Sequence, residues 1–349
     1  MSVPAISVIM AVHNGQPYLE DCVASVLSQS VADFEFIVID DASSDGSTTV
    51  LEALAARDNR IKLTRNANNI GLTRSLNVGL EQARGEYIAR IDADDLCRPK
   101  RLEAQLEAML SDPDLIILGS GYGIIDEHGA PQGEVSVALS DARIRWLLGF
   151  SPPSFHPTYF FRRLAPDGTL VRYDEAFRTA QDFDLWSRLS KQGPGRVLAD
   201  VLIDYRRHAS GISVTQRLRQ AEDGRKVSQR NLIARLPEAL VAELEPLSTL
   251  LNGGQEARGP AVKAAVVAMR KLLSHDKEFF TDPADRKWMR RTAAGLLADA
   301  VLSRGKAIKR PMDTLRFVFH AADFLPALAK AIAERPATAR KALARLTRK

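Results

Sequence analysis

The chain has few cysteines and no long apolar segment. Only two of its 349 residues are cysteine, Cys22 and Cys97, and they form no CxxC motif. Neither a disulfide framework nor a cysteine-ligated zinc site is therefore expected. The longest apolar run, over 115–125, contains four glycine or serine residues and is shorter than the ~20 residues that a spanning helix needs. We expect a protein of the reducing cytoplasm that does not cross a membrane.

The N-terminus also lacks the features of a signal peptide. Neither a basic region nor a long apolar region precedes the first predicted strand, so no export is expected. No period of about 20 to 50 residues recurs, which argues against a repeat solenoid. With 45% apolar and 26% charged residues, the chain can bury at least one full core and is long enough for two domains.

Positive charge is concentrated at the C-terminus. Residues 304–349 hold 12 Lys and Arg against 3 Asp and Glu, a net charge of +9, so the rest of the chain sums to −4 within the total of +5. A negative body makes nucleic acid a poor partner. In the tail, basic residues interleave with Phe and Leu, which is typical both of a solvated helix face and of an interfacial helix. We expect this basic tail to bind an anionic membrane surface.

The first third of the chain alternates short β-branched runs with amphipathic stretches. This pattern predicts an α/β fold in which helices cover a mostly parallel sheet. Strands are predicted over 6–12, 34–40, 61–64 and 87–91. Helices are predicted over 17–29, 48–56, 72–83 and 99–111.

The pattern becomes mixed after 115–121 and then wholly helical. A hairpin tip is predicted over 126–133, a strand over 155–161, a helix over 181–192 and a short strand ending at Tyr205. From about residue 214 the spacing of apolar residues and the Pro and Gly breaks predict helices only. We therefore expect an α/β domain over 1–213 and a helical C-terminal region over 214–349.

The acidic turn, residues 92–95 with the sequence Asp-Ala-Asp-Asp, directly follows a predicted strand. Its three carboxylates would repel one another unless a cation lies among them, and such hard oxygen ligands suit Mg²⁺ or Mn²⁺ bridging phosphates. A lone motif of this kind is also typical of a solvated turn that caps a helix. His13 and Asp40 end other predicted strands, so we expect them to open onto the same crevice.

Four segments in order resemble the family 2 glycosyltransferases, and the resemblance extends over about residues 5–210. The segments are Ile-Ser-Val-Ile-Met-Ala-Val-His-Asn-Gly (6–15), Phe-Ile-Val-Ile-Asp-Asp-Ala-Ser-Ser-Asp-Gly-Ser (36–47), Asn-Ile-Gly-Leu-Thr-Arg-Ser-Leu-Asn (69–77) and Gly-Glu-Tyr-Ile-Ala-Arg-Ile-Asp-Ala-Asp-Asp (85–95). The resemblance implies the GT-A fold, with a nucleotide-binding part over 1–122 and an acceptor part over 123–213.

The resemblance also implies which residues bind the nucleotide. Ala11 and His13 would line the nucleoside pocket, and Asp40 and Asp41 would meet the uracil and ribose, with Asp41 at the base edge. Arg74 matches the family's basic residue beside the nucleotide, although a solvent-facing helix arginine is an equal alternative.

In the acidic turn, the resemblance assigns Asp94 to the metal and Asp92 to the ribose or sugar and the metal. Ala93 and Asp95 would contact substrate. His208, in Tyr-Arg-Arg-His-Ala-Ser-Gly-Ile-Ser (205–213), resembles a family histidine and would be a third metal ligand. The cofactor implied is Mn²⁺ or Mg²⁺.

The segment Thr-Ala-Gln-Asp-Phe-Asp-Leu-Trp (179–186) resembles the family's Glu-Asp-x-x-Leu-Trp element, with Gln181 in place of the glutamate. The general base is therefore assigned to Asp182 and not to Asp184. Taken alone, Asp182 could also cap a helix over 183–189, but the order of the motifs favours the base. His156 matches a family position near the acceptor, where it would orient the acceptor or pack beneath the base. Trp186, like Trp146, would line the acceptor groove or belong to the core.

From this resemblance we expect an inverting enzyme that moves one sugar from a UDP-sugar to a glycan or polyprenyl-linked acceptor. Surface polysaccharide or O-antigen assembly at the inner face of the plasma membrane is the expected process. A nucleotidyltransferase is an alternative, but it would normally carry a Gly-rich loop and a lysine after the first strand, which 12–15 does not offer. A non-catalytic sugar-nucleotide or membrane adaptor is a third interpretation.

Overall fold

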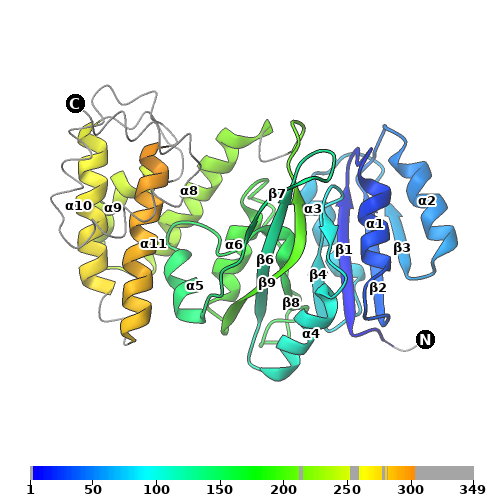
Figure 1. Cartoon of the computed structure of the whole chain (residues 1–349), viewed down its shortest axis with the longest axis horizontal. Coiled ribbons are helices and arrows are strands. Elements are labelled where there is room, and N and C mark those ends of the chain that lie inside the picture. The colour runs from blue at the N-terminus through cyan, green and yellow to red at the C-terminus, as the bar shows by residue number, and fades with distance from the viewer. Residues whose placement is uncertain (1–2, 212–214, 252–258, 277–279, 281, 303–349) are drawn as a thin grey trace. The chain divides into compact units, whose positions relative to one another are not determined.

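The computed structural model describes residues 3–211, 215–251, 259–276, 280 and 282–302 (Figure 1). The chain forms two compact units, Met1–Arg217 and Leu218–Lys349. The elements of the first unit, in chain order, are β1 (Ile6–Val12), α1 (Leu19–Leu27), β2 (Phe34–Asp40), α2 (Ser47–Arg57), β3 (Ile61–Arg65), α3 (Leu72–Gln82), β4 (Tyr87–Arg90), β5 (Leu96–Cys97), α4 (Arg101–Ser111), β6 (Ile117–Ile125), β7 (Pro131–Val135), α5 (Asp141–Leu147), η1 (His156–Thr158), β8 (Phe160–Arg162), α6 (Gln181–Leu189) and β9 (Gly195–Arg206).

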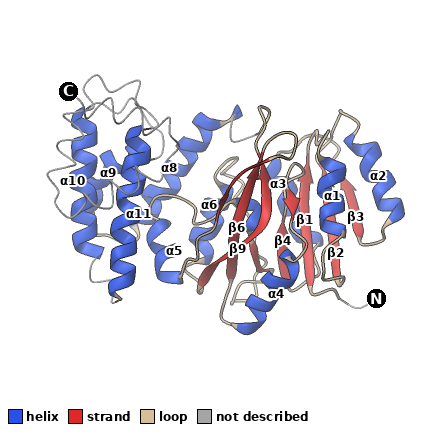
Figure 2. Ribbon diagram, viewed as in Figure 1, coloured by secondary structure: helices blue, strands red, loops and turns tan. Residues whose placement is uncertain are grey.

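The strands of this unit form one mixed sheet (Figure 2). Its order is β3-β2-β1-β4-β8-β6-β9-β5, and β7 pairs with β6 outside this path. The first four strands run parallel to one another, β8 is antiparallel to both β4 and β6, and β9 is parallel to β6. Because two antiparallel steps restore the direction, the carboxyl ends of β1, β2, β4, β6 and β9 share one edge of the sheet.

Helices cover both faces of the sheet because successive strand residues point to opposite sides. Ile6, Val8 and Met10 of β1 belong to a buried core to which α1, α2 and α4 also contribute. Ile9 points to the other face, where a Cβ on Gly79 of α3 would lie 2.7 Å from its Cγ2 atom. Strands covered on both faces read as nearly continuous apolar runs, and β1 and β2 do so apart from Ser7, Glu35 and the terminal Asp40.

The predicted fold class, an α/β fold with a mostly parallel sheet and a helical C-terminal region, is confirmed. One predicted element is wrong: 155–161 is not a strand but the short helix η1 followed by β8, Phe160–Arg162. Pro157 begins the bend, since it lacks an N–H for a ladder. The strand predicted to end at Tyr205 is β9, which spans 12 residues.

The second unit consists of helices in its described part. They are α8 (Arg217–Ile233), α9 (Glu238–Leu251), α10 (Gly259–Asp276) and α11 (Pro283–Leu302). α9, α10 and α11 pack against one another, and Leu247, Met269 and Leu272 are completely buried. The Arg235 guanidinium bonds the buried Asp276 carboxylate at 3.0 Å.

No helix among the described residues has the length and apolar character needed to span a bilayer. The predicted basic tail, 304–349, lies outside the described residues. Both cysteines, Cys22 and Cys97, are free and buried.

A buried carboxylate ties the central strands together. Glu35 of β2 accepts hydrogen bonds from Ser7 Oγ at 2.7 Å and from the backbone N–H of Arg84 at 2.8 Å, and its other oxygen accepts two from the Arg84 guanidinium. Burial alone would raise the pKa of Glu35, but the bonds from Ser7 and Arg84 outweigh it and lower that pKa.

This lowered pKa predicts an acid-dependent contribution to stability. Glu35→Gln should lower the free energy of unfolding at pH 7 by roughly 1–3 kcal/mol, because a buried, bonded charge is lost. The wild-type advantage is full above the ordinary glutamate pKa of about 4.3 and disappears as the pH falls through the lowered value. Urea unfolding of both proteins along a pH series measures this difference. Glu86→Gln is the matched control, since Glu86 forms an exposed ion pair with Arg162; an equal loss there would contradict the prediction.

Candidate active site

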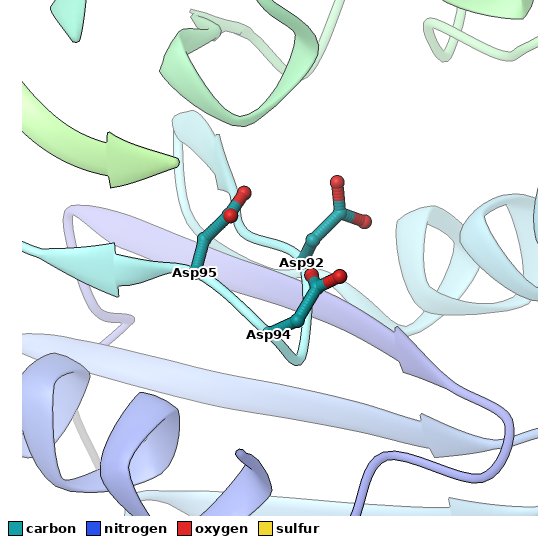
Figure 3. Close-up of side chains that lie close together, drawn as sticks. All are labelled: Asp92, Asp94 and Asp95. Atoms are coloured by element: carbon teal, nitrogen blue, oxygen red, sulfur yellow. The ribbon is translucent and has the colours of Figure 1, made fainter. Parts of the chain in front are cut away.

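The acidic turn lies directly after β4 at the carboxyl edge of the sheet (Figure 3). Ligand oxygens of Asp92, Asp94 and Asp95 all lie within 4.8 Å of one another. The backbone N–H of Asp95 closes the turn by donating to the Asp92 carbonyl at 3.3 Å. Three carboxylates at this spacing need nearby cations or donors, and each of them has a different one.

Arg90, the last residue of β4, holds Asp92. Its guanidinium is buried and donates through both terminal nitrogens to the two Asp92 oxygens, at 2.5 Å for Nη1 to Oδ2. Such a two-pronged pair fixes the carboxylate in both position and orientation. Burial raises the pKa of Asp92, as does the charge of Asp94, while Arg90 opposes the rise.

Arg206, the last residue of β9, holds the rest of the turn. Its backbone N–H donates to Asp95 Oδ1 at 2.9 Å, and its Nε donates to the Asp94 carbonyl at 2.9 Å. The same guanidinium lies 4.6 Å from the centroid of the Tyr18 ring. Backbone and side chain of one residue therefore join β9 to the acidic turn.

His208 follows two residues later and reaches the same turn. Its Nε2 lies 2.8 Å from Asp94 Oδ2, and its Nδ1 lies 2.8 Å from Ser210 Oγ. The structure thus brings Asp92, Asp94 and His208, the three residues predicted to bind the metal, to one place. Their role as ligands stays a prediction.

The donor set fits a hard divalent cation. Carboxylate oxygens dominate it, and Asp95 Oδ2 is a buried oxygen without a hydrogen-bond partner among the described residues. An unpaired buried anionic oxygen is costly unless a cation or donor reaches it. Asp92, Asp94 and His208, the predicted ligands, would hold Mg²⁺ or Mn²⁺, and Asp95 lies in the same group of carboxylates.

The residues predicted to bind the nucleoside end β1 and β2. Asp40 has no exposed surface, and its carboxylate accepts bonds from the Ser43 N–H at 2.9 Å and the Thr48 hydroxyl at 2.5 Å. It shapes the loop after β2. Ala11 is only partly buried and His13 is exposed, with His13 Nδ1 2.9 Å from the Asp41 carbonyl.

Asp41 orders the segment before α3. Its Oδ1 accepts from Asn66 Nδ2 at 2.8 Å and the Ile70 N–H at 2.9 Å, and its Oδ2 accepts from the Gly71 N–H at 2.8 Å. Gly71 has φ of +89°, a conformation that favours glycine. Arg74, on the first turn of α3, is 58% exposed and pairs with Glu175 at 3.0 Å. Contacts of Asp40, Asp41 and Arg74 with a nucleotide stay predictions.

Asp182 lies in the first turn of α6, next to Ala180, which has φ of +55°. Burial raises its pKa, while backbone hydrogen bonding and the charge of Arg90 oppose this rise. A carboxylate with a raised pKa is a better proton acceptor near neutral pH. Asp184 differs, because it is completely buried and its carboxylate bonds Arg188 at 2.8 Å. This contrast supports the choice of Asp182.

His156 is buried beside the same charges. Its Nε2 lies 2.9 Å from the Tyr173 hydroxyl. Burial lowers the pKa of His156 well below its ordinary value, and the charge of Arg90 lowers it further. The imidazole is therefore neutral at physiological pH. The predicted role near the acceptor stays a prediction.

Of the two alternatives predicted for Trp186 and Trp146, the structure places both rings in the core and not in an acceptor groove. Trp186 has no exposed surface and packs edge-on against Tyr159, with ring centroids 4.5 Å apart. Trp146 is 2% exposed and packs on Phe150 at 4.9 Å. The buried face of α6 and the packing of α5 place both rings in the core, where no substrate reaches them.

Two arginines of the site were missed in the sequence. Arg90 interrupts an otherwise apolar strand, Tyr-Ile-Ala-Arg-Ile, which is the signal of a charged residue with a buried partner. Arg206 is one of two consecutive arginines, and nothing in its local sequence indicates a role in the site. It reaches the acidic turn only because of the place of β9 in the sheet.

The fold and the site together define a class of enzyme, the glycosyltransferases with a GT-A fold. Among solved structures, the chain is similar to mannosyltransferase PcManGT from Pyrobaculum calidifontis in complex with GDP-Man and Mn²⁺, with a TM-score of 0.55, 19% identity, and coverage of 95% of this chain and 88% of that one. It is also similar to S. aureus TarS 1-349 in complex with UDP-GlcNAc, with a TM-score of 0.53, 18% identity, and coverage of 93% and 90%. At these identities the likeness shows the fold.

Sequence comparison identifies the family. Residues 7–163 match the family described as Glycosyl transferase family 2. The putative glycosyltransferase EpsE of Bacillus subtilis is 36% identical over 193 residues, which cover 54% of this chain and 68% of EpsE. The putative teichuronic acid biosynthesis glycosyltransferase TuaG of the same organism is 31% identical over 195 residues, 54% of this chain and 73% of TuaG. The chain belongs to glycosyl transferase family 2 and is a glycosyltransferase, which disfavours the nucleotidyltransferase and adaptor interpretations.

The donor set predicts a measurable metal affinity. Asp94→Asn should weaken Mn²⁺ binding by at least about tenfold, because a neutral amide replaces a carboxylate in a hard-ligand site. Isothermal titration of Mn²⁺ into both proteins measures it. The matched control is Glu107→Gln, an exposed carboxylate on α4, which should leave the affinity unchanged. Equal affinities for the wild type and Asp94→Asn would exclude Asp94 as a ligand.

Proposed function

We propose that this enzyme is an inverting, metal-dependent glycosyltransferase that moves one sugar from a UDP-sugar to an acceptor hydroxyl. The observation that carries the proposal is the acidic turn, whose three carboxylates share one edge of the sheet with the segment that holds His208. Asp182 supplies a second carboxylate site whose charge acts on Asp92. One site would hold the diphosphate through a metal, and the other would take a proton.

Asp182 is the proposed general base. As the acceptor oxygen attacks the anomeric carbon, its proton moves to a carboxylate oxygen of Asp182, and the bond to the nucleoside diphosphate breaks on the opposite face. When bound, Mn²⁺ or Mg²⁺ offsets the charge that grows on the departing diphosphate. With a single displacement the configuration inverts, so an α-linked donor gives a β-linked product.

The donor is assigned to the uridine series. In this proposal His13 and Ala11 line the nucleoside pocket, Asp41 meets the base edge, Asp40 and Arg74 support the ribose and phosphates, and Ala93 and Asp95 border the sugar. The two structural relatives support a nucleotide-sugar donor, since TarS was solved in complex with UDP-GlcNAc and PcManGT in complex with GDP-Man. Because the two relatives differ in base, the uridine assignment rests on the resemblance of Asp40 and Asp41 to the family's uracil and ribose contacts.

We place the enzyme in the assembly of surface polysaccharides, such as an O-antigen, at the cytoplasmic face of the membrane. TuaG is named for teichuronic acid biosynthesis, which supports a polysaccharide product. The basic tail would bind an anionic leaflet and bring the catalytic domain, 1–213, to a polyprenyl-linked acceptor. In this arrangement the helical region, 214–349, connects the catalytic domain to the membrane surface.

A donor screen tests the uridine assignment. UDP-sugars with Mn²⁺ should raise the melting temperature of the protein and release UDP, because the nucleoside pocket and the metal are both occupied. GDP-sugars and dTDP-sugars at equal concentration are the controls. Stabilisation by either control series, with none by UDP-sugars, would overturn the assignment.

The base assignment predicts a large loss of rate. Asp182→Asn should lower kcat for transfer by about 10²–10⁴-fold with little change in donor affinity, because the amide cannot accept the proton. Steady-state kinetics with the UDP-sugar found in the screen measure both quantities. Asp167→Asn, an exposed carboxylate in a turn, is the matched control. Normal turnover by Asp182→Asn would show that another group is the base.

A further inference from the structure

Three aromatic side chains gather where β6 and β9 approach their carboxyl ends. The ring of Phe155 lies 4.2 Å from that of Tyr205 and 5.4 Å from that of Tyr122, measured between centroids. All three side chains are only partly buried. Tyr87 and Phe160, in contrast, form a core pair that stacks at 5.6 Å, and they are 3% and 0% exposed. The aromatic cluster, Tyr122, Phe155 and Tyr205, is therefore a partly solvated surface.

The cluster connects the two halves of the active site. Tyr205 directly precedes Arg206, whose N–H bonds the Asp95 carboxylate at 2.9 Å. Phe155 directly precedes His156, whose ring bonds the Tyr173 hydroxyl, and the charge of Asp182 acts on Tyr173. One aromatic contact thus joins the segment that holds the acidic turn to the segment beside the base.

The sheet order places the cluster away from the nucleoside side. The residues assigned to the nucleoside follow β1 and β2, and the acidic turn follows β4. β6 and β9 lie beyond β4 and β8 in the sheet, with their carboxyl ends at the same edge (Figure 2). In the order of the sheet, the acidic turn therefore lies between the aromatic cluster and the residues assigned to the nucleoside, so the cluster is on the side that the proposed donor site does not use.

We propose that the aromatic cluster is an acceptor subsite that stacks against a sugar ring. A pyranose has an apolar face of C–H bonds with partial positive charge, and the negative face of an aromatic ring attracts it. Its hydroxyl rim stays in water or meets polar groups, which suits side chains that are half-buried and not enclosed. The acceptor class is therefore a glycan or glycoside with a free hydroxyl, and Phe155, not Trp186, is its aromatic contact. This inference rests on the proposed glycosyltransferase reaction.

The test compares transfer with donor hydrolysis. A panel of 4-nitrophenyl glycopyranosides serves as acceptors, and release of UDP without acceptor measures hydrolysis. Phe155→Ala should raise the KM for the glycoside by about tenfold, the order expected for loss of an aromatic stack, while hydrolysis falls by a smaller factor. Phe155→Trp should restore the KM. The control is Phe150→Leu, which alters the buried ring packed on Trp146 and should leave the glycoside KM unchanged.

Each outcome bears on a separate claim. If Phe155→Ala leaves the glycoside KM unchanged, the aromatic cluster is not an acceptor subsite. The same conclusion follows if the variant lowers transfer and hydrolysis equally. Hydrolysis of a UDP-sugar with no transfer to any glycoside of the panel also overturns the subsite, while leaving the donor assignment standing. If no nucleotide sugar is hydrolysed or transferred at all, the proposed function itself fails. Tyr122→Leu provides a second variant, with the same expected split, if Phe155→Ala does not fold.

Discussion

The repulsion among three carboxylates in one tight turn is the constraint on which the catalytic unit depends. Arg90, at the end of β4, offsets this repulsion by pairing with Asp92. Arg206, at the end of β9, offsets it by donating its backbone N–H to the Asp95 carboxylate. Buried charges persist only when such partners are hydrogen-bonded with good geometry. Because the two arginines come from strands far apart in the sequence, the same bonds fix the turn and deliver His208, two residues after Arg206, to it.

The guanidinium of Arg90 also links the acidic turn to the region of the base. Its charge opposes the rise in pKa that burial causes at Asp92 and Asp182, and it adds to the lowering that burial causes at His156. The positive charge of Arg90 therefore acts on both the Asp92 and the Asp182 carboxylates. Beside them, the neutral imidazole of His156 bonds the Tyr173 hydroxyl. Two carboxylates near one counter-charge would suit the proposed reaction, in which Asp92 belongs to the side that binds the anionic leaving group and Asp182 takes up the proton.

The alternation of strands and helices through residue 111, the position of the acidic turn and the start of α6 at Gln181 were predictable, because they follow from local patterns. The packing of side chains was not. Trp186 looked like a groove residue, yet the face of α6 on which it lies is buried. The segment 155–161 looked like a strand, yet Pro157 and the pairing of β8 break it in two. Asp41 directly follows β2, as predicted, but its carboxylate accepts a bond from the segment before α3, a contact across 29 residues that no local pattern reveals.

The metal site is the central claim, and anomalous diffraction tests it most directly. Crystals grown with UDP and Mn²⁺, measured at the manganese absorption edge, should show one strong anomalous peak bonded to Asp94, with Asp92 still paired to Arg90. A peak bonded to neither Asp94 nor Asp95, or bound UDP without a manganese peak at the acidic turn, would contradict the account.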